Sequence, residues 1–440
     1  MNKHPNILLA FYGDDLTGST DALEFICRAG AKAVLFMEVP TEEQLKTYPD
    51  IQVFGIAGHT RALPTEEMEK QLQPAFTAIK QTGARHVHYK VCSTFDSTPF
   101  IGSIGKAIDI GAAVFQNRFV PVLGGMPALG RYCVFGNLFA RMGIGSNGNV
   151  YRLDRHPSMS IHPVTPATES DLRLHLGAQT KEKIGLIDIV EMEKHTQLWT
   201  KAIKEQEEVV LLDASQVEHL QKIGEWLDQQ SDDNTQVFSV GSSGIEFALG
   251  AWWNKTKLLH PVQAWPQVKE ALPLLVLSGS YSPVSRYQIA YAVLQGFIEV
   301  PLVMNGSAVD CNLDKVLTAV RSNQSVIIHT GEIKGVDQSS SAAILGKALG
   351  SIGKTLCERI QIQRLVVAGG DTSSYAARAL GIEALEMIAP FLPGAPLCKA
   401  RAPGSPVDGM EVNFKGGQVG AEDYFVVMRD GNVSKTALAQ

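Results

Sequence analysis

The stretch that decides the fold reads FYGDDLTGSTD, from Phe11 to Asp21. The apolar run from Ile7 to Phe11 leads into it, and the residues from Asp21 to Ile26 that follow have helical spacing. This pattern predicts a buried strand, a short polar turn and a helix. In a parallel α/β sheet such a turn lies at the carboxyl edge of the strands, which is where ligands bind.

Two adjacent carboxylates, Asp14 and Asp15, stand at the start of this turn. Acids at a strand end can take a proton from a hydroxyl, hold a metal ion or bind sugar hydroxyls. The alternative is that one of them only caps the following helix. Capping needs a single acid and does not explain two. We therefore expect a catalytic role at this turn, and the sequence leaves Asp14 and Asp15 as equal candidates for a base.

The bulk properties narrow the class of protein. A chain of 440 residues exceeds what one hydrophobic core usually serves, so two domains are expected. The net charge is −6, and no basic stripe interleaved with aromatic residues indicates a nucleic-acid partner. The six cysteines are scattered without a C-x-x-C pair, which signals neither a zinc site nor a disulfide framework. Without a visible signal peptide or membrane-spanning run, we expect a cytoplasmic protein with no membrane partner.

Strand, turn and helix patterns recur along the whole chain. They predict an α/β protein of two domains, each a mainly parallel sheet flanked by helices, with an interdomain cleft. The segment from Trp252 to Pro266 interrupts this succession of strands and helices. We therefore place the domain boundary there, with domains at 1–262 and 263–440. The glycine-rich residues 130–148 are expected to loop over the site. His156 and His162 stand in proline-broken segments that are more often connectors than metal ligands, so no side chain is assigned to a metal.

Polar side chains also follow two further strands of the first half. Arg61 follows the strand at 51–57, and Lys90 ends the strand at 86–91. Ends of parallel strands align, so these cations should share a crevice with the acidic turn, where a guanidinium suits a substrate carboxylate. The residues after Lys90 supply hydroxyl partners: Ser93, Asp96 and Ser97. The alternative for Arg61 is a surface arginine, which we favour slightly less than a functional one. Each residue of the segment from Lys90 could alone equally belong to a solvated strand end with a capping serine.

The second half presents glycine and small hydroxyls at several strand ends. Such turns let a phosphate approach the backbone amides at a helix N-terminus. One of them alone is weak evidence, because α/β units use such turns anyway. The candidates for nucleotide contact are Ser280, Gly369, Gly370, Asp371, Thr372, Gly416, Gly417 and Gly420.

The motifs together resemble the four-carbon acid sugar kinases. GDDLTG at 13–18 with Asp21 is similar to the opening motif of that family, and KVCSTFDST at 90–98 to one form of its second motif. The glycine turns resemble its nucleotide-binding turns in the same order. The long stretch at 400–410 departs from the pattern and leaves the position of Lys399 relative to the nucleotide open.

The resemblance implies a two-domain, ATP-dependent kinase of a sugar acid such as 3-oxo-tetronate, threonate or erythronate. The hypothesis assigns the base to Asp14 or Asp15, the substrate carboxylate to Arg61 and Lys90, and the hydroxyls to Ser93 and Asp96. Mg²⁺ would bridge the ATP phosphates with few direct protein ligands. Transfer to the 4-hydroxyl is expected, and a homodimer is compatible with the sequence. The rivals are a nucleotide-independent isomerase or aldolase and a non-catalytic sugar-acid sensor.

Overall fold

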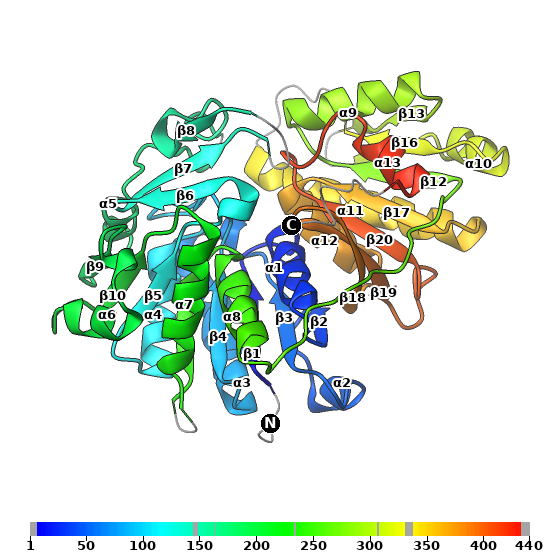
Figure 1. Ribbon diagram of the computed structural model, residues 1–440. Coiled ribbons are helices and arrows are strands. Elements are labelled where there is room, and N and C mark those ends of the chain that lie inside the picture. Colours follow the sequence, from blue (N-terminus) through cyan, green and yellow to red (C-terminus); the bar gives the residue numbers. More distant parts are fainter. Residues whose placement is uncertain are drawn as a thin grey trace. The chain divides into compact units, whose positions relative to one another are not determined.

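The computed structural model describes residues 7–143, 148–162, 164–232, 235–305, 308–330 and 338–432. The chain forms two compact units that meet in sequence between Gln263 and Ala264. Both units combine a sheet with flanking helices (Figure 1).

The first unit is built on a parallel sheet. Its strands are β1 (Leu9–Gly13), β2 (Ala33–Phe36), β3 (Val53–Ala57), β4 (His86–Lys90), β5 (Val120–Leu123), β9 (Ile184–Ile187), β10 (Val209–Leu212) and β11 (Val237–Gly241). They lie in the order β2-β3-β1-β4-β11-β5-β10-β9, and every one of these neighbours is parallel. β1 is buried along its whole length, which explains why its sequence is a continuous apolar run rather than an alternating one.

Helices cover both faces of this sheet. They are α1 (Leu16–Arg28), α2 (Glu42–Lys46), α3 (Thr65–Thr82), α4 (Ile104–Phe115), α5 (Leu172–Gly177), α6 (Thr196–Ala202), α7 (Val217–Gln229) and α8 (Gly244–Lys255). Short 3₁₀ turns are η1 (Thr60–Ala62), η2 (Pro127–Leu129), η3 (Leu153–Arg155) and η4 (Glu191–Glu193). Phe238 of β11 packs on Phe76 of α3 and Phe115 of α4, with ring centroids 5.3 and 5.2 Å away. His88, on the opposite side of the pleat, bonds Glu246 of α8. The two helix groups therefore lie on opposite faces.

The prediction that residues 130–148 loop over the site is wrong for the described part. A three-stranded antiparallel sheet begins there, made of β6 (Arg131–Val134), β7 (Asn137–Arg141) and β8 (Val150–Arg152). β6 and β7 alternate buried and half-buried residues, and Phe135 and Gly136 join them with positive φ angles of 48° and 80°. Positive φ at both central residues is the turn geometry that matches strand twist in a hairpin. Residues 144–147 lie outside the described part.

The second unit has a mixed sheet. Its strands are β12 (Leu274–Ser278), β13 (Ile298–Pro301), β14 (Val303–Asn305), β15 (Ala308–Asp310), β16 (Val326–His329), β17 (Arg364–Ala368), β18 (Ala384–Leu392), β19 (Ala395–Arg401) and β20 (Glu411–Lys415). The sheet has the order β13-β16-β12-β17-β20-β19-β18, while β14 and β15 form a separate hairpin. The first five strands are parallel, and β19 and β18 are antiparallel to their neighbours.

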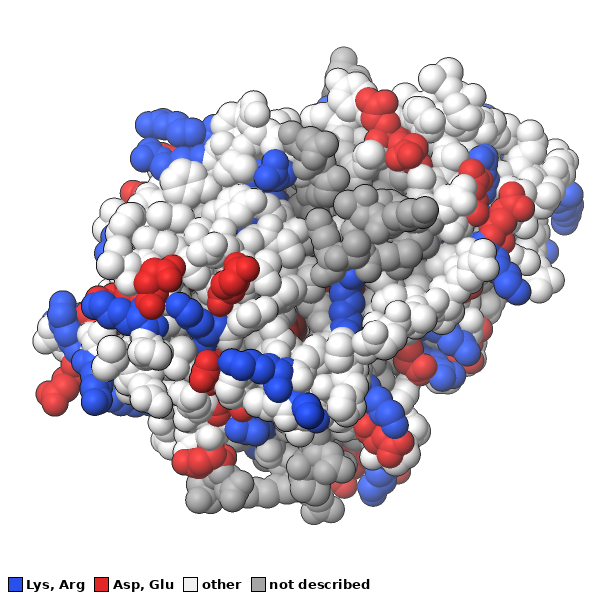
Figure 2. Space-filling model, in the orientation of Figure 1, with Lys and Arg blue, Asp and Glu red and all other residues white. Residues whose placement is uncertain are grey.

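The helices of the second unit are α9 (Pro283–Leu294), α10 (Leu313–Arg321), α11 (Gln338–Arg359), α12 (Gly370–Ala379) and α13 (Tyr424–Asp430). Residues of β12, β17, β18, α9 and α13 share one apolar core. In the space-filling view of Figure 2, basic and acidic side chains are interspersed over the face shown. Among the described residues, every helix is too short or too polar to cross a lipid bilayer. The predicted fold class, α/β with mainly parallel sheets, is confirmed.

Candidate active site

The ends of four neighbouring strands of the first unit lie in register. Gly13 at the end of β1 pairs with Ala57 of β3 and with Lys90 of β4, and Lys90 pairs with Gly241 of β11. The turns that follow these strands therefore open at the same edge of the sheet. This brings together the acidic turn, Arg61 and the segment that begins at Lys90.

Asp14 and Asp15 occupy different environments although they are adjacent. Asp15 is the N-cap of α1: its Oδ1 accepts from the amide of Gly18 at 2.8 Å, and its Oδ2 from the hydroxyl of Thr17 at 2.5 Å. The guanidinium of Arg61 lies 3.0 Å from the same Oδ2. Both oxygens of Asp15 are therefore committed to the turn and to Arg61.

Asp14 keeps one oxygen without a hydrogen-bond partner. Its Oδ2 accepts from the amide of Cys92 at 3.3 Å, while its buried Oδ1 accepts from no group among the described residues. Burial, and to a smaller extent repulsion from Asp15, raises the pKa of Asp14 to about 7. A buried carboxyl that titrates near neutral pH is suited to take a proton from a hydroxyl.

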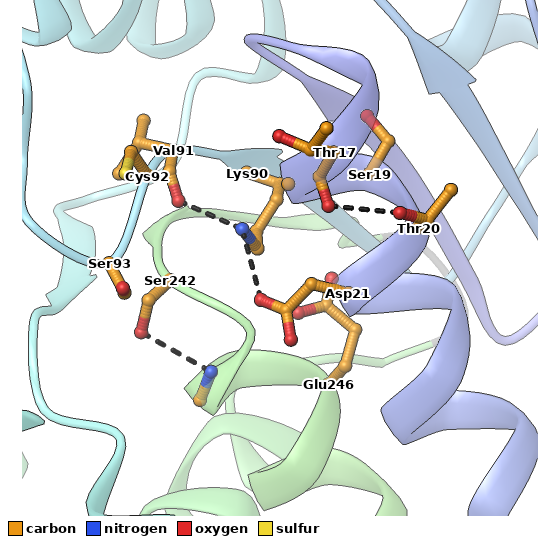
Figure 3. Close-up of polar contacts among 12 residues, drawn as sticks. Thr17, Ser19, Thr20, Asp21, Lys90, Val91, Cys92, Ser93, Ser242 and Glu246 are labelled. Atoms are coloured by element: carbon orange, nitrogen blue, oxygen red, sulfur yellow. Dashed lines mark hydrogen bonds and ion pairs between the residues drawn. The ribbon is translucent and has the colours of Figure 1, made fainter. Parts of the chain in front are cut away.

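Figure 3 shows the ammonium of Lys90 between the carbonyl of Val91 and the carboxylate of Asp21. Nζ of Lys90 donates to the carbonyl of Val91 at 3.0 Å and lies 3.5 Å from Oδ2 of Asp21. Burial lowers the pKa of Lys90, but Asp21 and Asp14 raise it more, so the net shift is upward and the side chain is an ammonium. Burial raises the pKa of Asp21, whose Oδ1 is buried without a described partner. Asp21, quoted above within the motif without a role, therefore belongs to this cluster.

The three polar residues after Lys90 are placed unequally. Ser93 is buried, and its hydroxyl accepts from the guanidinium of Arg131 at 3.1 Å. Asp96 is half-buried and accepts from the hydroxyl of Thr94 at 2.7 Å. Ser97 is enclosed by protein partners: its hydroxyl lies 2.8 Å from Nε2 of His175 and 3.0 Å from the side-chain amide of Gln179. Ser97 thus anchors the turn to α5, and this leaves it less available to a ligand.

Arg131 is a functional candidate that the sequence reasoning missed. It begins β6 inside the region expected to be a loop, and it is 5% exposed. Besides Ser93, its guanidinium donates to the carbonyls of Leu129 and Arg141 at 2.9 and 3.1 Å. No carboxylate among the described residues pairs with it, and burial lowers its pKa. A buried guanidinium without a carboxylate partner, next to a predicted site residue, is a signal that only the tertiary structure supplies.

The glycine turns of the second unit converge. β12, β17 and β20 are neighbours, with Ser278 in register with Ala368 and Ala368 with Lys415. The turns at Gly279-Ser280, at 369–372 and at 416–420 therefore follow three aligned strand ends. Helix α12 begins at Gly370, directly after Gly369, which has a positive φ of 132°. The backbone amides of its first turn have no partner within the helix and lie at this edge of the sheet.

The three turns approach one another too closely for larger side chains. A Cβ on Gly279 would come within 2.4 Å of Cγ2 of Thr372, and a Cβ on Gly417 within 2.8 Å of Oγ of Ser280. Gly420 has a positive φ of 86°. Backbone amides, small hydroxyls and absent Cβ atoms are the features that let phosphate oxygens reach a helix N-terminus. The residues therefore fit a nucleotide phosphate.

The position of Lys399, left open by the sequence, follows from strand register. Lys399 lies on β19 and pairs with Glu411, the first residue of β20. The glycine turn follows the last residue of that strand, four positions on and roughly 14 Å away. Lys399 is therefore at the other edge of the sheet.

The histidines considered as metal ligands serve the backbone. Nδ1 of His156 accepts from the amides of Ser158 and Met159, and Nδ1 of His162 from the amide of Thr165. Within the described ranges, no three His, Cys, Asp or Glu side chains are grouped as metal ligands would be.

Comparisons with known proteins agree with this division of features. Residues 9–249 match a family model described as a sugar-binding N-terminal domain, and residues 275–425 match one described as a nucleotide-binding C-terminal domain. The two matches cover most of the chain. The chain belongs to the four-carbon acid sugar kinase family, a class of phosphotransferases.

Individual relatives narrow the class. A protein of Paraburkholderia graminis named 3-oxo-isoapionate kinase is 38% identical over 97% of this chain and 95% of its own length. A protein of Pseudomonas savastanoi pv. phaseolicola named 3-oxo-tetronate kinase is 27% identical over 95% of this chain and 96% of its own length. The predictions of family and enzyme class are confirmed.

A crystal structure from Salmonella typhimurium LT2 superposes on the chain with a TM-score of 0.73. It is 25% identical and covers 96% of this chain and 98% of its own. A Haemophilus influenzae structure, 22% identical, has a TM-score of 0.66 over 95% of this chain and 98% of its own. Both support the fold.

Proposed function

We propose that this protein transfers the γ-phosphoryl group of ATP to a hydroxyl of a 3-oxo sugar acid, with the 4-hydroxyl as acceptor. The relatives named above act on 3-oxo-isoapionate and 3-oxo-tetronate, so the 3-oxo acid is the chemistry that their names share. Threonate and erythronate lack the oxo group and are the weaker substrates. The higher identity to the 3-oxo-isoapionate kinase makes that acid the first choice within the class.

The observation that carries the proposal is the unequal pair Asp14 and Asp15. Because Asp15 is held by its cap and by Arg61, it positions the turn. Asp14 has a free oxygen and a pKa raised to about 7, so it is the base that accepts the proton of the attacking hydroxyl. Beyond this base, phosphoryl transfer needs little covalent chemistry from the protein, because positioning of the reactants and stabilisation of charge provide most of the rate acceleration.

The substrate carboxylate is assigned to cations of the same strand edge. Arg61 already pairs with Asp15, and Lys90 lies close to Asp21. These two cations would therefore attract the substrate carboxylate mainly through their positive charge and less through hydrogen bonds. Arg131 has no described carboxylate partner and supplies the missing anion contact. Ser93 and Asp96 remain the candidates for substrate hydroxyls, whereas Ser97 is assigned to anchoring the turn.

The nucleotide is assigned to the second unit. Ser280, the amides of residues 369–372 and the turn at Gly416, Gly417 and Gly420 would hold its phosphates. This makes residues 1–262 the sugar-acid-binding domain and residues 263–440 the nucleotide-binding domain. Mg²⁺ would be held by phosphate oxygens and water, because it keeps several of its waters readily. The homodimer and the cytoplasmic location stay predictions, checked by light scattering and by cell fractionation.

A substrate panel tests the proposal. Purified protein is incubated with ATP, Mg²⁺ and one acid at a time: 3-oxo-isoapionate, 3-oxo-tetronate, threonate and erythronate. ADP release is followed with a coupled assay, and the site of phosphorylation by NMR of the product. The expected result is turnover with a 3-oxo acid and loss of turnover in Asp14→Asn. Binding of an acid without any ADP release would support the sensor instead, and turnover without ATP would support the isomerase or aldolase.

A further inference from the structure

Lys415 is a buried cation beneath the glycine turns, and neither the motifs nor the roles assigned above use it. It is the last residue of β20 and directly precedes Gly416. Its side chain is 0% exposed, so the ammonium is fully removed from solvent. A buried charge is costly unless a partner compensates it, so its partners show what the site is built for.

The neighbours of the Lys415 ammonium come from two elements, α9 and α13. Nζ donates to the hydroxyl of Ser285 in α9 at 3.2 Å. It lies 5.3 and 5.9 Å from the ring centroids of Tyr424 and Phe425 in α13. The phenol of Tyr424 donates to Asn413 of β20 and is therefore engaged elsewhere. None of these contacts is an anion, and no carboxylate among the described residues forms an ion pair with Lys415.

A chain of hydroxyls connects this cation to the predicted phosphate contacts. Oγ of Ser285 lies 2.9 Å from Oγ of Ser280 and 3.3 Å from the carbonyl of Gly417. The backbone of Lys415 also takes part, because its carbonyl accepts from the amide of Gly369 at 2.9 Å. Lys415 therefore touches all three glycine turns, directly or through one hydroxyl. No carboxylate is among the causes of the pKa shift of Lys415, so an anion bound at these turns would supply a counter-charge that the described residues do not.

We propose that Lys415 is a positioning residue for the nucleotide, an internal cation whose counter-charge is the phosphate group of ADP or ATP. The inference rests on the assignment of the nucleotide to these turns. It goes further by giving the charge of the phosphates a specific partner beneath the backbone amides. Ser285 accepts from the ammonium and donates to Ser280, so the ammonium fixes the hydroxyl of Ser280, whose own proton can donate to a phosphate oxygen.

The proposal predicts that nucleotide binding takes up a proton. Burial lowers the pKa of Lys415 to about 7 in the ligand-free protein, so near neutral pH part of the population is uncharged. A phosphate anion next to the side chain favours the ammonium. At about pH 8, most molecules must therefore gain a proton as ADP binds, and the affinity must fall as pH rises further, by up to about tenfold per pH unit.

Calorimetry measures this uptake directly. ADP with Mg²⁺ is titrated into the full-length protein at about pH 8 in buffers of different ionisation enthalpy, where ADP itself is fully ionised. The slope of binding heat against buffer enthalpy gives the protons taken up, and we expect roughly 0.5 to 1 per site. Lys415→Met should abolish the slope and weaken ADP binding about tenfold or more. Lys415→Arg, which stays charged, should bind ADP without proton uptake.

Lys399→Met is the matched control, because Lys399 lies in the same sheet at its other edge. It should retain the proton uptake and the ADP affinity of the wild type. A wild-type slope of zero overturns the proposal even if Lys415→Met fails to fold, and so does an unchanged ADP affinity in that variant. Failure of the wild type to bind ADP at all would instead overturn the nucleotide assignment together with this inference.

Discussion

The guanidinium of Arg61 lies 3.0 Å from Oδ2 of Asp15, and this contact gives the adjacent acids Asp14 and Asp15 different roles. Arg61 follows β3 and Asp15 follows β1, two parallel neighbours in register. Because the ion pair and the helix cap use both oxygens of Asp15, only Asp14 keeps an oxygen for a substrate hydroxyl.

Asp14→Asn should lower kcat by about 10²–10⁴-fold, because the amide cannot accept the proton of the attacking hydroxyl. ADP affinity should not change, since Asp14 belongs to the first unit. Asp15→Asn is the paired variant: asparagine is also a good N-cap, so kcat should fall by about tenfold or less. Steady-state kinetics and ADP titrations measure both. A larger loss in Asp15→Asn than in Asp14→Asn would reverse the assignment.

The pH dependence of the wild type should report the same carboxyl. Because a base works only when deprotonated and the pKa of Asp14 is about 7, kcat/KM for the acid, measured at saturating ATP, should rise with pH and level off above about 7. The rising limb should be absent from the residual activity of Asp14→Asn. An identical limb in the variant would assign the titration to another group.

Asp14 should cost folding stability at neutral pH. Its pKa rises from 3.8 in the unfolded chain to about 7 in the folded protein, so the folded state binds more protons between these values. Stability therefore falls as pH rises from about 4 to about 7, and the full penalty is present above about 7. Asp14→Asn should raise the melting temperature at about pH 7 and lose this advantage near pH 4.

The exposed carboxylate Asp50 provides the control for that measurement. Its pKa is lowered by Lys32, so the linkage has the opposite sign. Asp50→Asn should show no gain in melting temperature at about pH 7. Equal melting temperatures of Asp14→Asn and the wild type at every pH between about 4 and about 7 would contradict the predicted cost of burying Asp14.

Arg131→Met should raise KM for the acid substrate by about 10–100-fold, because it removes a charge-assisted contact to the carboxylate. KM for ATP should stay within about twofold. Arg131→Lys should recover only part of the loss, since an ammonium does not reproduce the bidentate fork. Competitive inhibition by simple carboxylates gives an independent readout. An unchanged KM for the acid in a folded Arg131→Met would leave Arg131 with a structural role alone.

Gly279→Ala should weaken ADP binding, because the new Cβ would lie 2.4 Å from Cγ2 of Thr372 and force the two turns apart. Adding Thr372→Ser removes that methyl group but keeps Oγ1 and Cβ of residue 372, which would lie 2.7 and 2.9 Å from the new Cβ, so it should recover only part of the affinity. Gly177→Ala, whose Cβ would meet nothing within 4 Å, is the neutral comparison. A double variant as weak as Gly279→Ala would show that the methyl group of Thr372 is not the cause.

Local sequence patterns predicted much of the framework. The apolar run before Gly13 is β1, the glycine and hydroxyl turns do follow strand ends, and Asp15 is the helix cap that the alternative interpretation allowed for one acid. These features depend on residues a few positions apart, which is why the chain reveals them. The prediction for residues 130–148 is wrong because glycines stand before and between β6 and β7, and these strands of four and five residues are too short for their period of two to be recognised.

The sequence by itself determined the class of this protein: an acidic turn after the first strand, hydroxyl-rich and glycine-rich turns after later ones, and in these turns motifs that resemble those of the four-carbon acid sugar kinases. Only the tertiary structure decided which acid is free, that Arg131 is a buried cation without a described carboxylate partner, and that Lys415 lies under the glycine turns. The physical reason is that protonation and charge depend on burial and on partners brought together by strand register. Arg131 lies 38 residues from Ser93, and Lys415 lies 130 from Ser285, so no local pattern reports either contact.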